Sequence, residues 1–86
     1  MKFKKDRPYA DVAAAEKKLL ELANAMEADH AGRLHVGPIN RQFLEAGGSV
    51  AEYTAAVRAA IDRGYIALHP SGAYMTFTQA GAELFA

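Results

Sequence analysis

The sequence contains no cysteine, so the chain can form neither a disulfide framework nor a metal site with thiolate ligands. It also lacks a long uncharged apolar run and a leader-like start. We therefore expect a soluble, cytoplasmic protein that has no membrane partner. No repeat, low-complexity tract or linker interrupts the 86 residues, which predicts one small domain with a modest core.

Neither sign of charge is in excess, because ten basic and ten acidic residues give a formal net charge of zero. Such a balance is not typical of proteins that bind polyanions strongly. Residues 1–7 nevertheless hold four basic side chains and one acidic one, a charge of +3, whereas residues 8–86 hold six basic and nine acidic ones, a charge of −3. The basic side chains at this end are Lys2, Lys4, Lys5 and Arg7.

This charge distribution predicts a flexible basic arm at residues 1–8 and a folded domain at residues 9–86. Lys4 and Lys5 are candidate contacts to the phosphates of a polyanion. The alternative is a frayed end that only aids solubility.

Histidine and serine are present but form no recognised catalytic set. His30 and His35 are five residues apart with no helix predicted to hold them, so they are weak evidence for a metal site. Ser49 is explained as a helix cap and Ser71 as a turn residue. No glycine-rich phosphate loop follows a predicted strand. We therefore expect a protein that is not an enzyme and that has no cofactor and no metal.

Four segments have the apolar spacing of helices. The first begins between Pro8 and Val12 and runs to Ala28. Its predicted core positions are Val12, Ala15, Leu19, Leu22, Ala23 and Met26. Leu20 lies at the edge of this stripe, where it either completes the core, which we favour, or serves a partner surface.

A glycine turn separates the next two helices. Pro38 suits the first turn of a short helix that ends at Ala46, and Gly47 with Gly48 stops it.

The third helix begins with a capping box, in which Ser49 and Glu52 satisfy free amides of the first turn. It runs to Arg63, and Gly64 is placed to close it in a left-handed conformation. The side chains predicted to be buried along it are Val50, Tyr53, Val57, Ala60 and Ile61.

The segment RGYIALHPSGAYMTFTQAG, residues 63–81, predicts a hairpin that leads into a last helix. His69 to Gly72 fits a type I turn. Pairing Leu68 with Ala73 then places Ile66 opposite Met75. This register points Ile66, Leu68, Ala73, Met75 and Phe77 inward and Tyr65, Ala67, Tyr74 and Thr76 outward.

A two-stranded ribbon is marginal in water, so we expect the hairpin to pack on the helices. His35 and Val36 are candidates for a third strand. Thr78 is placed to cap the last helix, which runs through Phe85.

The order helix, strand stub, helix, glycine turn, helix, hairpin, helix resembles the winged helix-turn-helix superfamily of bacterial regulators. The resemblance covers about Val12 to Ala86. Its most specific parts are RGYI at the end of the third helix and YMTFTQAG at the return into a helix, which are similar to the wing ends of drug-resistance-type and related repressors. It implies an α+β fold, a small winged helix-turn-helix with about four helices and a two- or three-stranded antiparallel wing.

The resemblance also implies that Val50 to Arg63 is a recognition helix whose outer face enters a major groove. Helical rotation places five side chains on that face, with Glu52 at its margin: Ala51, Ala55, Arg58, Ala59 and Asp62. Ala55 and its small neighbours would permit close approach to base edges. Arg58 could contact guanine or a phosphate, and Ser49 and Thr54 could bond phosphate.

The predicted wing tip contains His69 and Ser71, which are candidate DNA contacts, but no lysine or arginine. Insertion of an arginine into the minor groove is therefore not expected from the hairpin, and the basic arm is the substitute. Arg41, on the helix before the turn, is a further candidate for the DNA backbone, and Arg33 is another. Either is equally explained as a solvated side chain.

We therefore expect a protein that binds duplex DNA, as a transcriptional regulator or as an accessory nucleoid, phage or plasmid-type protein. A homodimer would suit two half-sites, with Leu20, Phe85, Tyr65 and Tyr74 as candidate contacts. The alternative is a winged-helix interaction module that binds a protein partner through its alanine-rich face and does not bind DNA.

Overall fold

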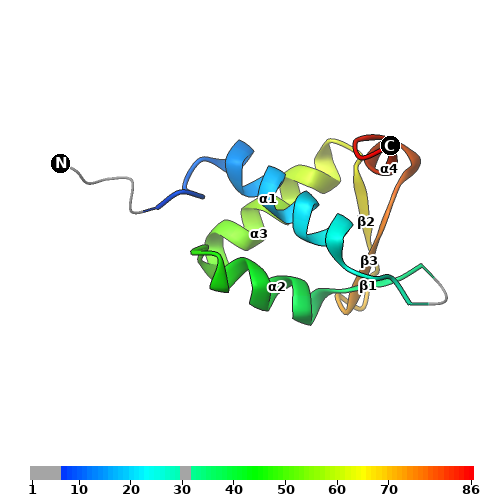
Figure 1. Cartoon of the computed structure of the whole chain (residues 1–86), viewed down its shortest axis with the longest axis horizontal. Helices are drawn as coiled ribbons and strands as arrows, with labels where there is room; N and C mark the ends of the chain where they lie inside the picture. The colour runs from blue at the N-terminus through cyan, green and yellow to red at the C-terminus, as the bar shows by residue number, and fades with distance from the viewer. Residues whose placement is uncertain (1–6, 30–31) are drawn as a thin grey trace.

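The computed structural model describes residues 7–29 and 32–86. Within this part the fold is α+β, with four helices and a three-stranded antiparallel sheet, in the order expected for a winged helix (Figure 1). The elements are α1 (Val12–Ala25), β1 (Leu34–His35), α2 (Val36–Glu45), α3 (Val50–Asp62), β2 (Ile66–Leu68), β3 (Tyr74–Phe77) and α4 (Gln79–Glu83). No helix in the described residues is long and apolar enough to cross a membrane.

The core lies between the three long helices and the inner face of the sheet. Small side chains in α1 and α3 let these two helices pack closely, and Phe43 and Ile39 of α2 fill the space beside them. The alanines concerned, all at most 1% exposed, are Ala15, Ala23, Ala56 and Ala60. Leu20 is 5% exposed and therefore completes the core, as we favoured.

Helix α1 is shorter than predicted. Asp11 caps it by accepting a hydrogen bond from the Ala13 amide, and it ends at Ala25 because Met26 has an extended backbone. The predicted end at Ala28 is therefore wrong. The chain from Met26 instead runs toward β1 through a loop in which the Asp29 carboxylate accepts a hydrogen bond from the Arg33 amide.

The glycine turn and both caps of α3 are as predicted. Gly47 has a φ of +108°, and Gly48 lies against Phe43 so closely that a β-carbon there would be 2.1 Å from the ring. The Ser49 hydroxyl accepts from the Glu52 amide while the Glu52 carboxylate accepts from the Ser49 amide. Gly64 closes α3 with a φ of +79°.

The sheet has the order β1-β3-β2, so β3 is central. The third strand is Leu34–His35, whereas Val36, which we had placed in it, begins α2. The predicted hairpin register is wrong by two residues, because Leu68 pairs with Met75 and Ile66 with Phe77.

The register differs because the Ala73 backbone forms hydrogen bonds with the turn and with α2 and does not pair with β2. The type I turn is present, since the Gly72 amide donates to the His69 carbonyl at 2.8 Å and Ser71, the third residue of the turn, does not have the positive φ of a type II turn. The Ala73 amide donates to the Ser71 hydroxyl, and its carbonyl accepts from the Val36 amide. A shift of two residues leaves every side chain on its predicted face.

Burial on the inner face is uneven along the hairpin. Ile66 and Met75 are buried and Phe77 is half-buried, but Leu68 is 39% exposed and Ala73 is exposed. The sheet therefore covers the core near α4 and lies open near the turn.

Helix α4 is fixed to the start of the hairpin. The Thr78 hydroxyl caps α4 by accepting from the Gly81 amide and donates to the Gly64 carbonyl at 2.6 Å. Gly81 is buried against the Tyr65 carbonyl. The two ends of the hairpin are thus joined beside α4, as Figure 1 shows at the end of the molecule that carries the sheet.

Candidate nucleic-acid interface

The outer face of α3 is the candidate interface, and it differs from the predicted face. Tyr53, Ala56 and Ala60 are buried against the rest of the core, whereas Val50 is 64% exposed and Ile61 39% exposed. The prediction that Val50 and Ile61 are buried is therefore wrong. Large apolar side chains suggested the core face, but α1 packs on the face that carries the small alanines, which allow the closer approach.

Two predicted DNA contacts lie on this outer face with their polar groups uncommitted among the described residues. Arg58 and Thr54 are both exposed on α3. Ala55 is half-buried. The Ser49 hydroxyl already accepts from the Glu52 amide at 3.1 Å, so only its proton is available to a phosphate.

An apolar groove of about 360 Å³ runs between α3 and the sheet. It is lined chiefly by Val36, Val57, Ile61, Leu68 and Met75, with Arg58 among its polar residues. Tyr53 also lines it; the Tyr53 hydroxyl is buried with no hydrogen-bond partner among the described residues, and burial raises its pKa.

The first turn of α3 carries a contact from the N-terminal end of the chain. The Arg7 guanidinium donates two hydrogen bonds to the Glu52 carboxylate, Nη2 to Oε1 at 2.6 Å and Nε to Oε2 at 3.2 Å. This hydrogen bonding from Arg7 holds the pKa of Glu52 below its ordinary value. Arg7, predicted to be part of the flexible arm, is thus bound to the helix-turn-helix. No local sequence pattern could indicate a pair 45 residues apart.

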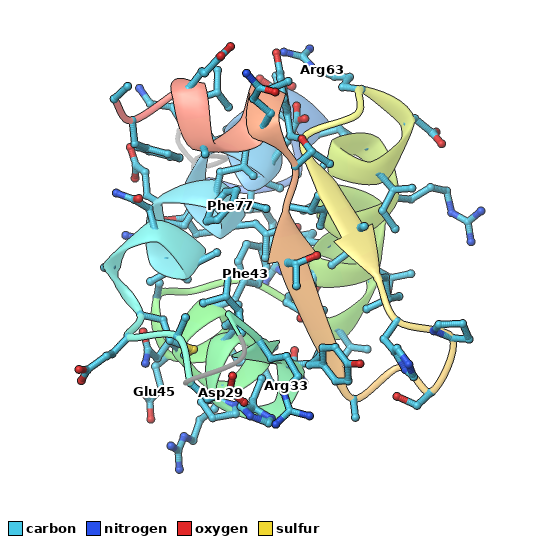
Figure 2. The ribbon with its side chains drawn as sticks, turned by 90° about the vertical axis from the view of Figure 1, so that its right-hand side faces the viewer. Asp29, Arg33, Phe43, Glu45, Arg63 and Phe77 are labelled. Atoms are coloured by element: carbon cyan, nitrogen blue, oxygen red, sulfur yellow. The ribbon has the colours of Figure 1, made fainter. Side chains whose placement is uncertain are left out.

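Two other arginines are also paired. Arg33 contacts Asp29 at 2.9 Å and lies over the Tyr74 ring, and Arg63 contacts the buried Glu16 at 3.3 Å. Figure 2 shows Asp29 and Arg33 side by side at the end of the sheet opposite to Arg63. Arg41 on α2 is exposed and, like Arg58, has no ion pair within the described residues.

The wing tip is ordered by its own side chains. His69 Nδ1 lies 2.8 Å from the Ser71 hydroxyl and accepts from the Ser71 amide, and the His69 ring stacks on Tyr74 with centroids 4.5 Å apart. Both predicted contacts are exposed, and His69 Nδ1 and the Ser71 hydroxyl are engaged with each other. The second ring nitrogen of His69, Nε2, has no hydrogen-bond partner among the described residues and is left for an external contact.

Other predicted site residues fall elsewhere. Lys4, Lys5 and His30 lie outside the described residues. Of the candidate dimer contacts, Phe85 and Tyr65 line a second hollow of about 330 Å³ together with Leu84, and the buried Leu20 and Glu16 form part of its wall. Tyr74 lies away from this hollow, at the turn end of β3, where its ring contacts His69 and Arg33.

Comparison of the chain with protein-family models, with curated proteins and with solved structures gives no match.

Proposed function

We propose that the protein binds duplex DNA through the outer face of α3 and acts in transcription or nucleoid, phage or plasmid-type regulation in the cytoplasm. The observation that supports this is the arrangement of α2, the glycine turn and α3, which leaves Arg58 and Thr54 exposed on one face of the second helix. A helix presented in this way can enter a major groove. The small side chain of Ala51, exposed on the same helix, would permit close contact with thymine methyl groups.

The charges on this face predict weak, salt-sensitive binding. Arg41 and Arg58 are available for phosphates, whereas Arg7, Arg33 and Arg63 are paired with carboxylates. Each phosphate contact contributes about 0.9 to the slope of log K against log salt, so two contacts lose roughly tenfold in affinity between 50 and 200 mM salt. The lysines of the basic arm would add to this term.

Titration of ¹⁵N-labelled protein with mixed-sequence duplex DNA at low salt tests the proposal. We expect the largest amide shifts at residues 49–58, and a weaker response in an Arg58→Ala variant. Shifts confined to the first seven residues would mean non-specific contact by the arm alone. An unshifted α3 at saturating duplex would refute the proposal.

The apolar groove supports a second candidate function, binding of a protein segment. Ile61 and Leu68 expose apolar surface in the groove that Arg58 also lines, a composition more typical of a protein interface than of a phosphate-binding face. The fitting partner is an amphipathic helix that places apolar side chains in the groove and a carboxylate on Arg58. This function is favoured if duplex DNA leaves α3 unshifted.

A further inference from the structure

The N-terminal segment crosses the helix-turn-helix and touches both of its helices. Arg7 binds Glu52 of α3, and the Tyr9 ring lies 5.2 Å from the Phe43 ring of α2, measured between centroids. Pro8 lies over the turn, since a β-carbon built on Gly47 would be 3.9 Å from its Cγ. Residues 7–9 are therefore part of the motif and not a free end.

The Glu52 carboxylate is held in place by a contact that does not involve Arg7. Its Oε1 accepts from the Ser49 amide at 3.0 Å, which fixes the side chain in the capping box. The carboxylate is 14% exposed and the Arg7 side chain 50% exposed. A two-point contact between a planar guanidinium and an oriented carboxylate has a defined geometry, unlike a contact made by lysine.

This pair has an electrostatic consequence for α3. The first turn of a recognition helix lies close to DNA phosphates, where an uncovered carboxylate would repel them. Arg7 neutralises that charge.

We propose that Arg7 is a positioning residue, which covers the Glu52 carboxylate and so removes its repulsion of phosphates beside α3, and that it is not itself a phosphate contact. This inference rests on the proposed DNA binding. The proposed role belongs to the ion pair, because Arg7 can cover a carboxylate only while it is bound to Glu52.

A double-mutant cycle on Arg7→Gln and Glu52→Gln separates the two roles. Glutamine at position 52 keeps an acceptor for the Ser49 amide and removes only the charge. If Arg7 covers Glu52, Arg7→Gln weakens duplex binding at 50 mM salt by about three- to tenfold in the wild-type background and by less than about twofold in Glu52→Gln. If Arg7 binds phosphate directly, the loss is equal in both backgrounds and the salt slope falls by about 0.9 in each, which would overturn the inference.

Glu45→Gln provides the matched control background. Glu45 is exposed at the end of α2, as Figure 2 shows, and has no ion pair within the described residues, so the substitution makes the same charge change at a carboxylate that Arg7 does not bind. Arg7→Gln should weaken binding there as it does in the wild type. If Arg7→Gln weakens binding by less than about twofold in Glu45→Gln as well, net charge alone is responsible for the effect. That result would also overturn the inference.

A measurement without DNA distinguishes failure of this inference from failure of the proposed function. The side-chain carboxyl shift of Glu52, followed by NMR against pH, should give a higher pKa in Arg7→Gln than in the wild type. An unchanged pKa means that the ion pair does not form in solution. A raised pKa in a protein that binds no duplex means that the pair exists but that the proposed DNA binding, and the role of Arg7 in it, are wrong.

Discussion

At the scale of single residues, two helical glycines test the packing directly, because one has no room for a β-carbon and the other has open space around it. Gly81 in α4 is buried, and a β-carbon there would lie 2.0 Å from the Tyr65 carbonyl oxygen. Gly37 in the first turn of α2 has nothing within 4 Å of the same position. Helix propensity favours alanine over glycine at both by up to about 1 kcal/mol.

We therefore expect Gly81→Ala to lower the free energy of unfolding by about 1–3 kcal/mol, because backbone must move to make room for the methyl group. Gly37→Ala should leave it unchanged or raise it. Urea denaturation followed by circular dichroism measures both. Equal stability of the two variants would mean that α4 does not dock against Tyr65.

Arg58 is the side chain on which sequence recognition by α3 depends most. If it contacts a guanine edge, Arg58→Ala should cost about 1–3 kcal/mol on the preferred duplex and relax discrimination at one base pair. Competition binding against a panel of single-base variants measures this. The Arg41→Ala variant, which would remove only a backbone contact, should weaken all duplexes alike; a panel that responds identically to the two changes would assign Arg58 to phosphate.

At the scale of elements, the hairpin tests how far the core extends along the sheet. Phe77 is half-buried, packs against the core and lies 6.0 Å from the Phe85 ring, whereas Leu68 on the same face is 39% exposed. Phe77→Ala should cost about 3 kcal/mol, at the low end for a core phenylalanine, and Leu68→Ala about 1 kcal/mol or less. Thermal unfolding of the two variants checks this order, and a larger loss from Leu68 would place the core nearer the turn.

The elements that local chemistry specifies were predictable from the sequence. The capping box of Ser49 and Glu52, the left-handed Gly64 and the Thr78 cap each depend on residues within a few positions of one another. The hairpin register was not, because it depends on a hydrogen bond from the Val36 amide to the Ala73 carbonyl that joins distant segments.

Only part of the candidate interface was predictable from the sequence, because the rest also depends on contacts between distant segments. Arg58 follows from helical rotation, but the buried side of α3 is decided by what packs there, and the buried Ala56 was not among the side chains predicted for that side. The contact of Arg7 with Glu52 joins residues 45 positions apart and has no pattern at all.

At the scale of the whole molecule, the exposed apolar surface near the C-terminal end predicts self-association. Leu84 is 48% and Phe85 37% exposed, and both line the hollow formed with α1 and Tyr65. A dimer would bury this surface and suit two half-sites on a duplex. Sedimentation velocity over a wide concentration range, with and without a two-site duplex, should show a dimer that Phe85→Ser weakens.

Leu44→Ser is the control for that experiment, because Leu44 is 38% exposed on α2, away from the hollow, and the substitution removes a similar amount of exposed apolar surface. It should leave the association unchanged. A protein that stays monomeric on DNA at all concentrations would favour binding to a single site.

The central place of β3 in the sheet has a consequence for the order in which the chain folds. β2 reaches β3 across a short turn, but β1 pairs Leu34 with Met75, 41 residues further along the chain. Closing the longer loop costs more conformational entropy, so the hairpin can form early while β1 docks only after α2 and α3 have brought its ends together. Substitutions in β1 should then accelerate unfolding and leave the folding rate nearly unchanged, whereas substitutions in the hairpin should slow folding.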